Sequence, residues 1–395
     1  MLQIAPPESA ALLLFALCLC GLAASVSART MDPLVTILAA DFSVAVASAA
    51  LIVSAYTLPF ALGQPLLGPL GDVYGRPRML KACLWLLAAF LLAASLAPSL
   101  DLLFAARFCA GLVAGGIIPA CMATIGDTYP PHRRQLAISK FVTVGLLAQV
   151  FSASASGALA EMFGWRSVMV ASASLAILGA VMATAILRRA AAPPRPFSLQ
   201  VAAANYASVF RNPKAALCYS TVFLEGVALY GMLPYIAEIM RATKQGGPRE
   251  AGIIIGALGV GGIVYTSVLA LLLRRFERPH FMAAGGVLMT VGPVTLAAGQ
   301  PWTLVALAFG FTGFGFMLLH NSIQTEVVEL APDARQSAYS LHAFSFFTGQ
   351  ALGPALYGAG FAVLGTAGAM LLGASLMLIT GVTISALFAR VSPGD

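Results

Sequence analysis

Long apolar stretches follow one another along almost the whole chain, separated by short polar segments. Each stretch has about 20 residues or more, which is enough for an α-helix to cross a hydrocarbon core of roughly 30 Å. A helix suits such a stretch because it satisfies its own backbone polar groups without water. The sequence predicts twelve spans, over residues 11–40, 45–67, 79–98, 102–124, 136–160, 166–188, 214–240, 251–273, 281–299, 302–326, 338–362 and 366–389.

The composition excludes an ordinary soluble protein. Apolar residues make up 59% of the 395 residues and charged residues 9%, whereas soluble domains have about 45–50% and about 25%. The net charge of +7 does not indicate nucleic acid, because the positive charge is concentrated in alternate loops. If the N-terminus is cytoplasmic, sixteen of the 22 Lys and Arg residues face the cytoplasm. The positive-inside rule therefore predicts that both termini are cytoplasmic.

An internal repeat relates the two halves of the chain. A shift of 201 residues superposes identical residues from several predicted spans. The matching pairs are Met31 with Met232, Pro33 with Pro234, Arg134 with Arg335, Gln149 with Gln350 and Gly157 with Gly358. We predict one bundle over residues 1–189, a second over 214–395, and a cytoplasmic linker over 190–213, whose Pro and basic residues suit the membrane surface.

The segment Gly68–Arg78 is a short, cationic connection between two predicted spans. Such a short connection makes the two helices antiparallel neighbours, and Gly71 and Gly75 permit close backbone approach and tight turns. Asp72 and Arg76 then lie at the mouth of the helices. We predict that these charges act as a gating latch.

Two motifs resemble signatures of the major facilitator superfamily. The first is the loop just described, Gly-x-Leu-Gly-Asp-x-Tyr-Gly-Arg-x-Arg in this chain, and the second is Arg107-Phe108-x-x-Gly111-x-x-x-Gly115 in the fourth span. The resemblance implies an all-α membrane protein with twelve transmembrane helices in two pseudo-symmetric six-helix bundles. In such a fold a central site opens alternately to each side.

The same resemblance implies partners for the latch. The aspartate would meet the N-terminal end of helix eleven, where the helix dipole favours negative charge. The arginine would pair with an acid below helix four, and Asp127 fits that place for Arg76. The second half carries Phe276-Glu277-Arg278-Pro279, which lacks the Gly-Asp pair. We therefore expect a one-sided latch.

A first group of ionisable residues lies in the N-terminal half. Charged side chains in a span are costly and are functional candidates by default. Asp32 follows Arg29 by three residues, so the two share a helical face, and Arg107 enters helix four at a similar depth. We hypothesise a cluster in which protonation of Asp32 releases an arginine. The alternative is a permanent ion pair that holds helices one and four together.

A second group lies in the C-terminal half. Glu225 is near the middle of helix seven, and apolar surroundings favour proton exchange by such a carboxyl group. His320 in helix ten shares its span with Asn321 and Gln324, which supply hydrogen-bonding groups at helical spacing. We predict proton coupling through Glu225 and His320, and substrate contacts from the two amides. The alternative for each is a structural hydrogen bond, and His342 in helix eleven is a weaker candidate.

Aromatic residues recur in the helices that line the cavity in the resembled family. We predict that Tyr56 and Tyr230 bind the substrate, and the alternative is ordinary packing.

We expect a secondary active transporter that moves a small, partly apolar molecule across the bacterial inner membrane, since the chain is similar to drug:proton antiporters and sugar-efflux permeases. Proton-coupled efflux is the favoured mode, although helix five has no Gly-Pro pair of the antiporter kind. Proton symport or facilitated uptake of a small metabolite is the first alternative, and a membrane sensor that does not transport is the second.

The sequence gives no sign of an enzyme. It has no phosphate-binding loop, and its four His residues do not cluster at metal-ligand spacing, so we expect no metal and no cofactor. The expected partners are a small-molecule substrate, protons and the lipid bilayer. We expect no nucleic acid, and we expect a monomer.

Overall fold

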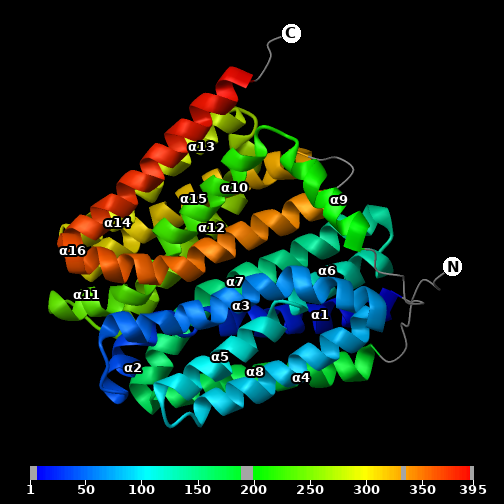
Figure 1. Ribbon diagram of the computed structural model, residues 1–395, viewed down its shortest axis with the longest axis horizontal. Coiled ribbons are helices and arrows are strands. Elements are labelled where there is room, and N and C mark those ends of the chain that lie inside the picture. The colour runs from blue at the N-terminus through cyan, green and yellow to red at the C-terminus, as the bar shows by residue number, and fades with distance from the viewer. Residues whose placement is uncertain (1–6, 188–198, 331–334, 392–395) are drawn as a thin grey trace. The chain divides into compact units, whose positions relative to one another are not determined.

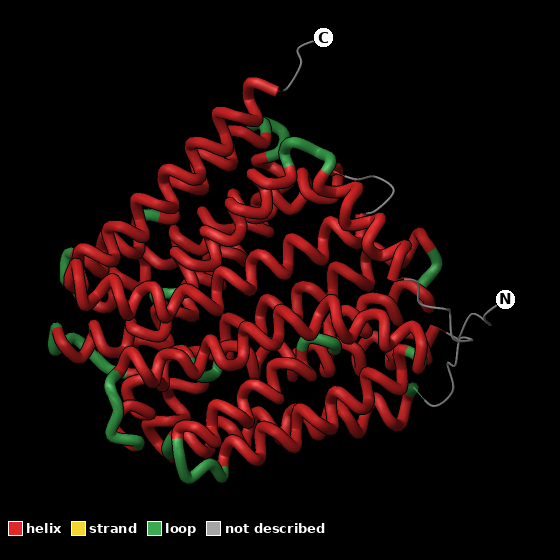
Figure 2. Tube along the Cα trace, in the orientation of Figure 1, coloured by secondary structure: helices red, strands yellow, loops and turns green. Residues whose placement is uncertain are grey.

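The computed structural model describes residues 7–187, 199–330 and 335–391. Helices joined by short turns make up these residues, and Figure 2 shows no strand among them. The helices of the first half are α1 (Pro7–Arg29), α2 (Val35–Asp41), α3 (Val46–Tyr74), α4 (Arg76–Ser95), α5 (Leu100–Ala114), α6 (Ile117–Thr128), α7 (Pro131–Phe163) and α8 (Trp165–Ile186).

The second half continues the helical pattern. Its α-helices are α9 (Leu199–Phe210), α10 (Ala215–Glu225), α11 (Ile236–Ala242), α12 (Pro248–Leu272), α13 (Arg278–Met289), α14 (Val291–Ala297), α15 (Trp302–Leu330) and α16 (Arg335–Val391). Three short segments have other helical geometry. They are the 3₁₀-helices η1 (Asp32–Leu34) and η3 (Leu233–Tyr235) and the π-helix η2 (Gly226–Tyr230).

Ten stretches of the described residues are long and apolar enough to cross a membrane. The last, Ser337–Ala389, has 53 residues and suffices for two crossings. Its helix α16 breaks at Gly365, where φ is 69°, and Figure 1 shows it as an orange rod and a red rod that meet at the break. Helix α7, with 33 residues, is also longer than one crossing needs. The prediction of an all-α membrane fold with twelve transmembrane helices is confirmed.

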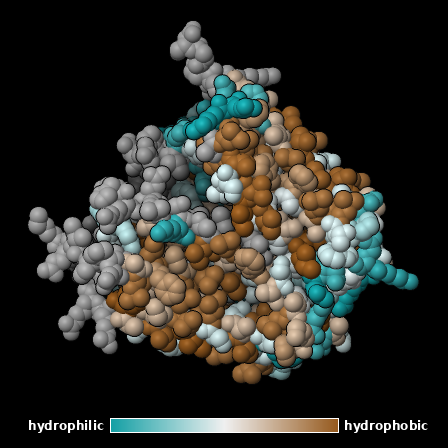
Figure 3. Space-filling view, turned by 180° about the vertical axis from the view of Figure 1, so that it is seen from behind, coloured by the Kyte–Doolittle hydropathy of each residue, from teal (hydrophilic) through white to brown (hydrophobic). Residues whose placement is uncertain are grey.

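Apolar side chains cover much of the protein surface. Figure 3 shows them over most of the visible face, with hydrophilic residues gathered towards its edges. Phe151, Phe163 and Val363 are among the large apolar residues that are exposed. A soluble protein rarely exposes so large an apolar area. Lipid is the solvent that fits this surface.

The described residues divide into two compact units. The first takes those of Met1–Met31 and Ala55–Phe197, and the second takes those of Asp32–Ser54 and Ser198–Asp395. Within the second unit, η1 and α2 pack on η3 and α11. The predicted linker contains α9, and the predicted bundle boundaries at residues 189 and 214 stay a prediction.

The first helix of each half is interrupted at the same place in the repeat. The sequence predicts unbroken helices over 11–40 and 214–240, but η1 interrupts the first and η2 and η3 interrupt the second. The two 3₁₀ segments contain Pro33 and Pro234 and lie 201 residues apart, which is the offset of the sequence repeat. Proline cannot donate the backbone hydrogen bond that continues an α-helix, which explains why both helices break there.

Gly111 brings α5 against α3. A Cβ atom at this position would collide with the backbone carbonyl oxygen of Tyr56 and would lie 3.0 Å from the Pro59 side chain. A glycine therefore allows the two helix backbones to touch. Gly126 on α6 is a useful contrast, because a Cβ atom there would meet nothing within 4 Å.

We predict opposite effects of the same substitution at these two glycines. Gly111→Ala should lower the melting temperature in detergent, because overpacking of helix contacts typically costs about 1–3 kcal/mol. Gly126→Ala should leave it unchanged or raise it, because alanine is favoured over glycine in helices by up to about 1 kcal/mol. Equal melting temperatures for the two variants would contradict the packing described.

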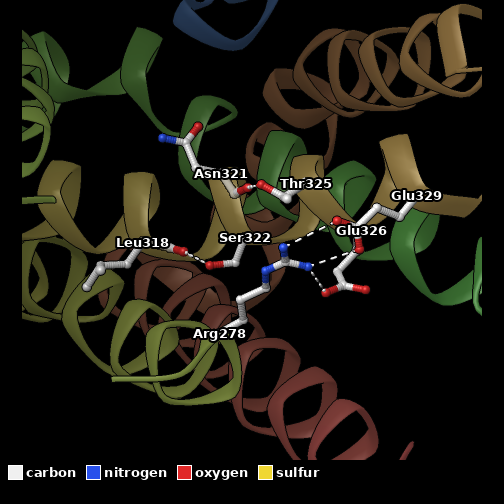
Figure 4. Close-up of polar contacts among 7 residues, drawn as sticks. All are labelled: Arg278, Leu318, Asn321, Ser322, Thr325, Glu326 and Glu329. Atoms are coloured by element: carbon white, nitrogen blue, oxygen red, sulfur yellow. Dashed lines mark hydrogen bonds and ion pairs between the residues drawn. The ribbon is translucent and has the colours of Figure 1, made fainter. Parts of the chain in front are cut away.

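An ion-pair cluster joins the start of α13 to the end of α15. Figure 4 shows the Arg278 guanidinium between two carboxylates, with Nη1 at 2.8 Å from Glu326 Oε1 and 3.1 Å from Glu329 Oε2. A second nitrogen, Nη2, donates to Glu329 Oε1 at 3.3 Å. Arg278 is 43% exposed, and exposed ion pairs contribute only about 0–1 kcal/mol each. The cluster therefore orients α13 and α15 more than it stabilises them.

We predict that Arg278→Gln changes the unfolding free energy by no more than about 1 kcal/mol. Arg278→Glu should cost more, because it places three acids together, and the double variant with Glu329→Arg should recover part of the loss. Melting temperatures of the wild type, Arg278→Glu, Glu329→Arg and the double variant measure this coupling. Arg275→Gln, at an exposed arginine of the same loop, is the control.

Candidate functional site

A carboxyl group and an imidazole meet in the interior of the second unit. Glu225 is the last residue of α10 and His320 lies on α15, and Glu225 Oε2 is 2.8 Å from His320 Nδ1. The side chains are 2% and 12% exposed. Glu225 Oε1 is buried and has no hydrogen-bond partner among the described residues. The structure thus brings together two residues that the sequence identified separately, 95 residues apart.

The backbone around Glu225 is unusual. The π-helix η2 begins directly after it, and π-helical turns are rare and often lie at functional sites. Gly226 has no room for a side chain, because a Cβ atom would collide with the carbonyl oxygen of Phe346 on α16. Gly349 on α16 makes the reciprocal contact with the carbonyl of Phe223. Backbone contact between α10 and α16 therefore fixes the position of Glu225.

Aromatic rings surround the carboxyl–imidazole pair. The His320 ring stacks on Phe316 with centroids 4.8 Å apart and lies 4.6 Å from the ring of Phe346. Tyr230, a predicted substrate residue, approaches Phe316 and Phe346 edge-on at 5.7 and 5.4 Å. These rings make the environment of the pair largely apolar.

A second imidazole lies next to the pair. The ring centroids of His342, on α16, and His320 are 4.8 Å apart, with an interplanar angle of 62°. His342 is 2% exposed, and its Nε2 atom has no hydrogen-bond partner among the described residues. The sequence ranked His342 low because nothing in it shows that the two histidines face each other from different helices.

Asn321 and Gln324 lie on α15 close to His320, and both are half-buried. The backbone carbonyl of Asn321 accepts a hydrogen bond from the Thr325 hydroxyl at 2.8 Å. Figure 4 shows the Asn321 side chain pointing away from Arg278. Their predicted role in substrate binding stays a prediction.

The first unit holds a buried arginine. Arg107 on α5 is fully buried, donates from Nη1 to the Ser27 carbonyl at 3.0 Å, and places its guanidinium 4.1 Å from the centroid of the Tyr56 ring. The Tyr56 hydroxyl is 2.7 Å from Ser27 Oγ. Ser27 on α1 thus contacts both partners. Sequence reasoning missed it, because a serine in a helix usually bonds its own backbone, as Ser27 also does to Ala24.

Arg29 and Asp32 are also buried. Arg29 is the last residue of α1, and Asp32 opens η1. Asp32 belongs to the second compact unit, whereas Arg29 and Arg107 belong to the first. The predicted cluster of these three residues stays a prediction.

The predicted latch lies where α3 meets α4. Gly75 separates the two helices with a φ of 92°, a conformation that favours glycine, and Arg76 is the first residue of α4. Gly71 and Asp72 lie near the end of α3, and their surroundings fall outside the part of the structure described at side-chain level. Asp127 on α6 falls outside it too. The pairing of Arg76 with Asp127 stays a prediction.

The second half contains an arginine–acid pair at the places that correspond to Arg76 and Asp127. A shift of 202 residues carries Arg76 onto Arg278 and Asp127 onto Glu329, and the structure pairs Arg278 with Glu329. The sequence suggested a one-sided latch because the Gly-Asp pair is missing from the second loop. An arginine–acid pair can form without that glycine turn, since its two partners come from α13 and α15.

A largely apolar groove of about 480 Å³ lies within the first unit, between α1, α7 and α8. Its walls include Val26, Leu147 and Leu175, with a few serine side chains. None of the predicted site residues lines it. Among the described residues, no group of three or more His, Cys, Asp or Glu side chains has an arrangement that could hold a metal ion.

Proteins with similar sequences include several that are named as transporters. The 4-hydroxybenzoate transporter PcaK of Pseudomonas aeruginosa is 26% identical over 68% of this chain and 68% of its own length. The purine ribonucleoside efflux pump NepI of Escherichia coli is 23% identical over 76% of this chain and 75% of its own length. The matches to three further relatives span 61%, 26% and 89% of those relatives' own lengths.

The fold also has close counterparts among solved structures. A bacterial homologue of the human lysosomal transporter Spinster superposes with a TM-score of 0.73 at 17% identity, covering 97% of both chains. The family model described as Major Facilitator Superfamily matches residues 17–278 and 215–395. The chain belongs to the Major Facilitator Superfamily.

Proposed function

We propose that this membrane transporter moves a small, partly apolar molecule across the inner membrane by alternating access, with both termini in the cytoplasm. We further propose that its mode is efflux coupled to protons. The family supports transport rather than enzymatic catalysis. The single observation that carries the coupling is the buried contact of 2.8 Å between Glu225 and His320.

The charge of this pair depends on protons. With the carboxyl group ionised and the imidazole neutral, the pair carries one negative charge, and one added proton makes it neutral. A net charge inside a membrane span is costly, by several kcal/mol. Protonation therefore changes which packing of the helices around the pair is favourable. Transport becomes coupled if the substrate-loaded and empty forms differ in that packing.

The names of two relatives inform the substrate and the direction. Purine ribonucleosides and 4-hydroxybenzoate both combine a planar ring with polar groups. The rings of Tyr230, Phe316 and Phe346 beside Glu225 suit a molecule of that kind. NepI is named as an efflux pump, which supports the outward direction.

We predict that Glu225→Gln abolishes substrate movement driven by a pH gradient in proteoliposomes but retains exchange of substrate across the membrane. The amide keeps the size of the carboxyl group and cannot exchange a proton in this pH range. The measurement is lumenal pH together with substrate flux, over a panel of planar aromatic and heteroaromatic compounds. His320→Gln should also lose gradient-driven movement.

Glu277→Gln is the matched control, because Glu277 is an exposed acid just before α13. It should couple like the wild type. Gradient-driven transport that survives in Glu225→Gln at the wild-type rate would contradict the proposal. Flux in the direction of proton movement would replace efflux with symport.

In the first unit, we propose that Tyr56 has two roles. Its ring stabilises the buried charge of Arg107, and it also binds the substrate. Tyr56→Phe keeps the ring beneath the guanidinium and loses the contact with Ser27, so it should cost about 1 kcal/mol of stability. Tyr56→Leu also removes the cation–π contact and should cost about 2 kcal/mol or more. Melting temperatures and transport rates in liposomes test this order, and equal losses would contradict it.

A further inference from the structure

We infer that His342 is the third member of a proton path that links the Glu225–His320 pair to the start of α16. The inference rests on the proposed function, since a path of this kind serves a carboxyl group that exchanges protons. It assigns a role to His342, whose ring contacts His320 and Tyr339.

Three side chains from three different helices form a row in space. Glu225 on α10 is within hydrogen-bond distance of His320 on α15, and the His320 ring is in contact with that of His342 on α16. His320 Nδ1 is occupied by the carboxylate, so the opposite ring nitrogen, Nε2, remains for the next step. A centroid separation of 4.8 Å places the two rings edge to face in direct contact.

The first and third members of this row each carry a buried polar atom without a partner in the part of the chain that the structure describes. These atoms are Glu225 Oε1 and His342 Nε2, and both side chains are 2% exposed. A histidine kept only for packing would be less favourable than an apolar ring of similar shape, because its buried nitrogen lacks a hydrogen bond. Buried polar atoms that are free to gain or lose a proton are what such a path requires.

Beyond His342 the row continues towards the surface. Tyr339 lies three residues earlier on α16, and its ring is nearly parallel to that of His342 at 6.1 Å. Tyr339 is 48% exposed and lies four residues from Arg335, where α16 begins. In the predicted orientation this end of α16 is cytoplasmic. The row therefore runs from the membrane interior towards the cytoplasmic side.

Other titratable groups on the same helices make contacts of their own. Tyr219 on α10 donates its hydroxyl hydrogen to the Ala338 carbonyl at 3.2 Å. Tyr230 on η2 contacts the aromatic rings, and Glu326, six residues beyond His320 on α15, pairs with Arg278. Besides Glu225, none of these is a carboxylate directed at the imidazoles. The charge that the two histidines respond to is that of Glu225.

The proposed transfer conserves protons. A proton on His342 Nε2 passes to His320 Nε2, directly or through one water, while the proton on His320 Nδ1 moves to Glu225 Oε2. His342 returns to its neutral form, His320 changes tautomer, and the carboxylate becomes a neutral carboxyl group. After the carboxyl proton leaves to the opposite side, His320 Nε2 releases its proton to water and Nδ1 takes one up from water, which restores the starting tautomer with no net change in protons.

The test is the rate at which Glu225 gains a proton after a pH jump. Time-resolved infrared spectroscopy on the full chain follows the carboxyl band, which is assigned by its loss in Glu225→Gln. We expect His342→Gln and His342→Phe to slow the appearance of this band by at least about tenfold. The phenylalanine keeps a ring beside His320 and Tyr339 and removes both ring nitrogens. His280→Gln, at a histidine in the first turn of α13, is the control and should keep the wild-type rate.

The outcomes separate this inference from the proposed function. If wild-type protein shows no gradient-driven transport, proton coupling fails, yet the infrared rate still decides the role of His342. If wild-type protein couples and both His342 variants keep the wild-type rate and the wild-type dependence of transport on pH, the path is overturned. Melting temperatures identify a variant that is misfolded, and the rate is then taken from the other variant.

Discussion

The contact between Glu225 and His320 is needed because the membrane interior holds no water to solvate a buried carboxylate. In the interior of a membrane span, a carboxylate needs a partner, and here the partner comes from a helix 95 residues away in the chain. The pair thereby ties α10 to α15, and its total charge changes with one proton. In the proposed function, structural and functional demands on Glu225 coincide, because the contact that makes its burial tolerable is also the one that a proton alters.

Small residues and irregular helix turns place this contact. Gly226 and Gly349 let the backbones of α10 and α16 touch, and η2 begins at the residue after Glu225. The first unit uses the same device, since Gly111 brings α5 against α3 beside the buried Arg107. In both units, a glycine at a contact between two helix backbones lies within four residues of a buried ionisable group.

The fold could be predicted from sequence because lipid imposes a simple rule of length and apolarity on every span. The repeat offset of 201 residues also reappears, in the breaks at Pro33 and Pro234. Glu225 and His320 could be identified one by one as costly residues in a span, but their pairing could not, because helical spacing says nothing of which face meets another helix. Ser27 and His342 were missed or ranked low for the same reason. Their importance comes from contacts with other helices.

The most direct test of proton coupling at Glu225 is the zero-flux point. Proteoliposomes hold a set pH gradient, and the substrate gradient is varied until net substrate movement stops, at several values of the pH gradient. The account predicts that this point shifts with the pH gradient in the wild-type protein and stays at equal substrate concentrations in Glu225→Gln. A wild-type zero-flux point set by substrate concentration alone would contradict it and would make the protein a facilitator.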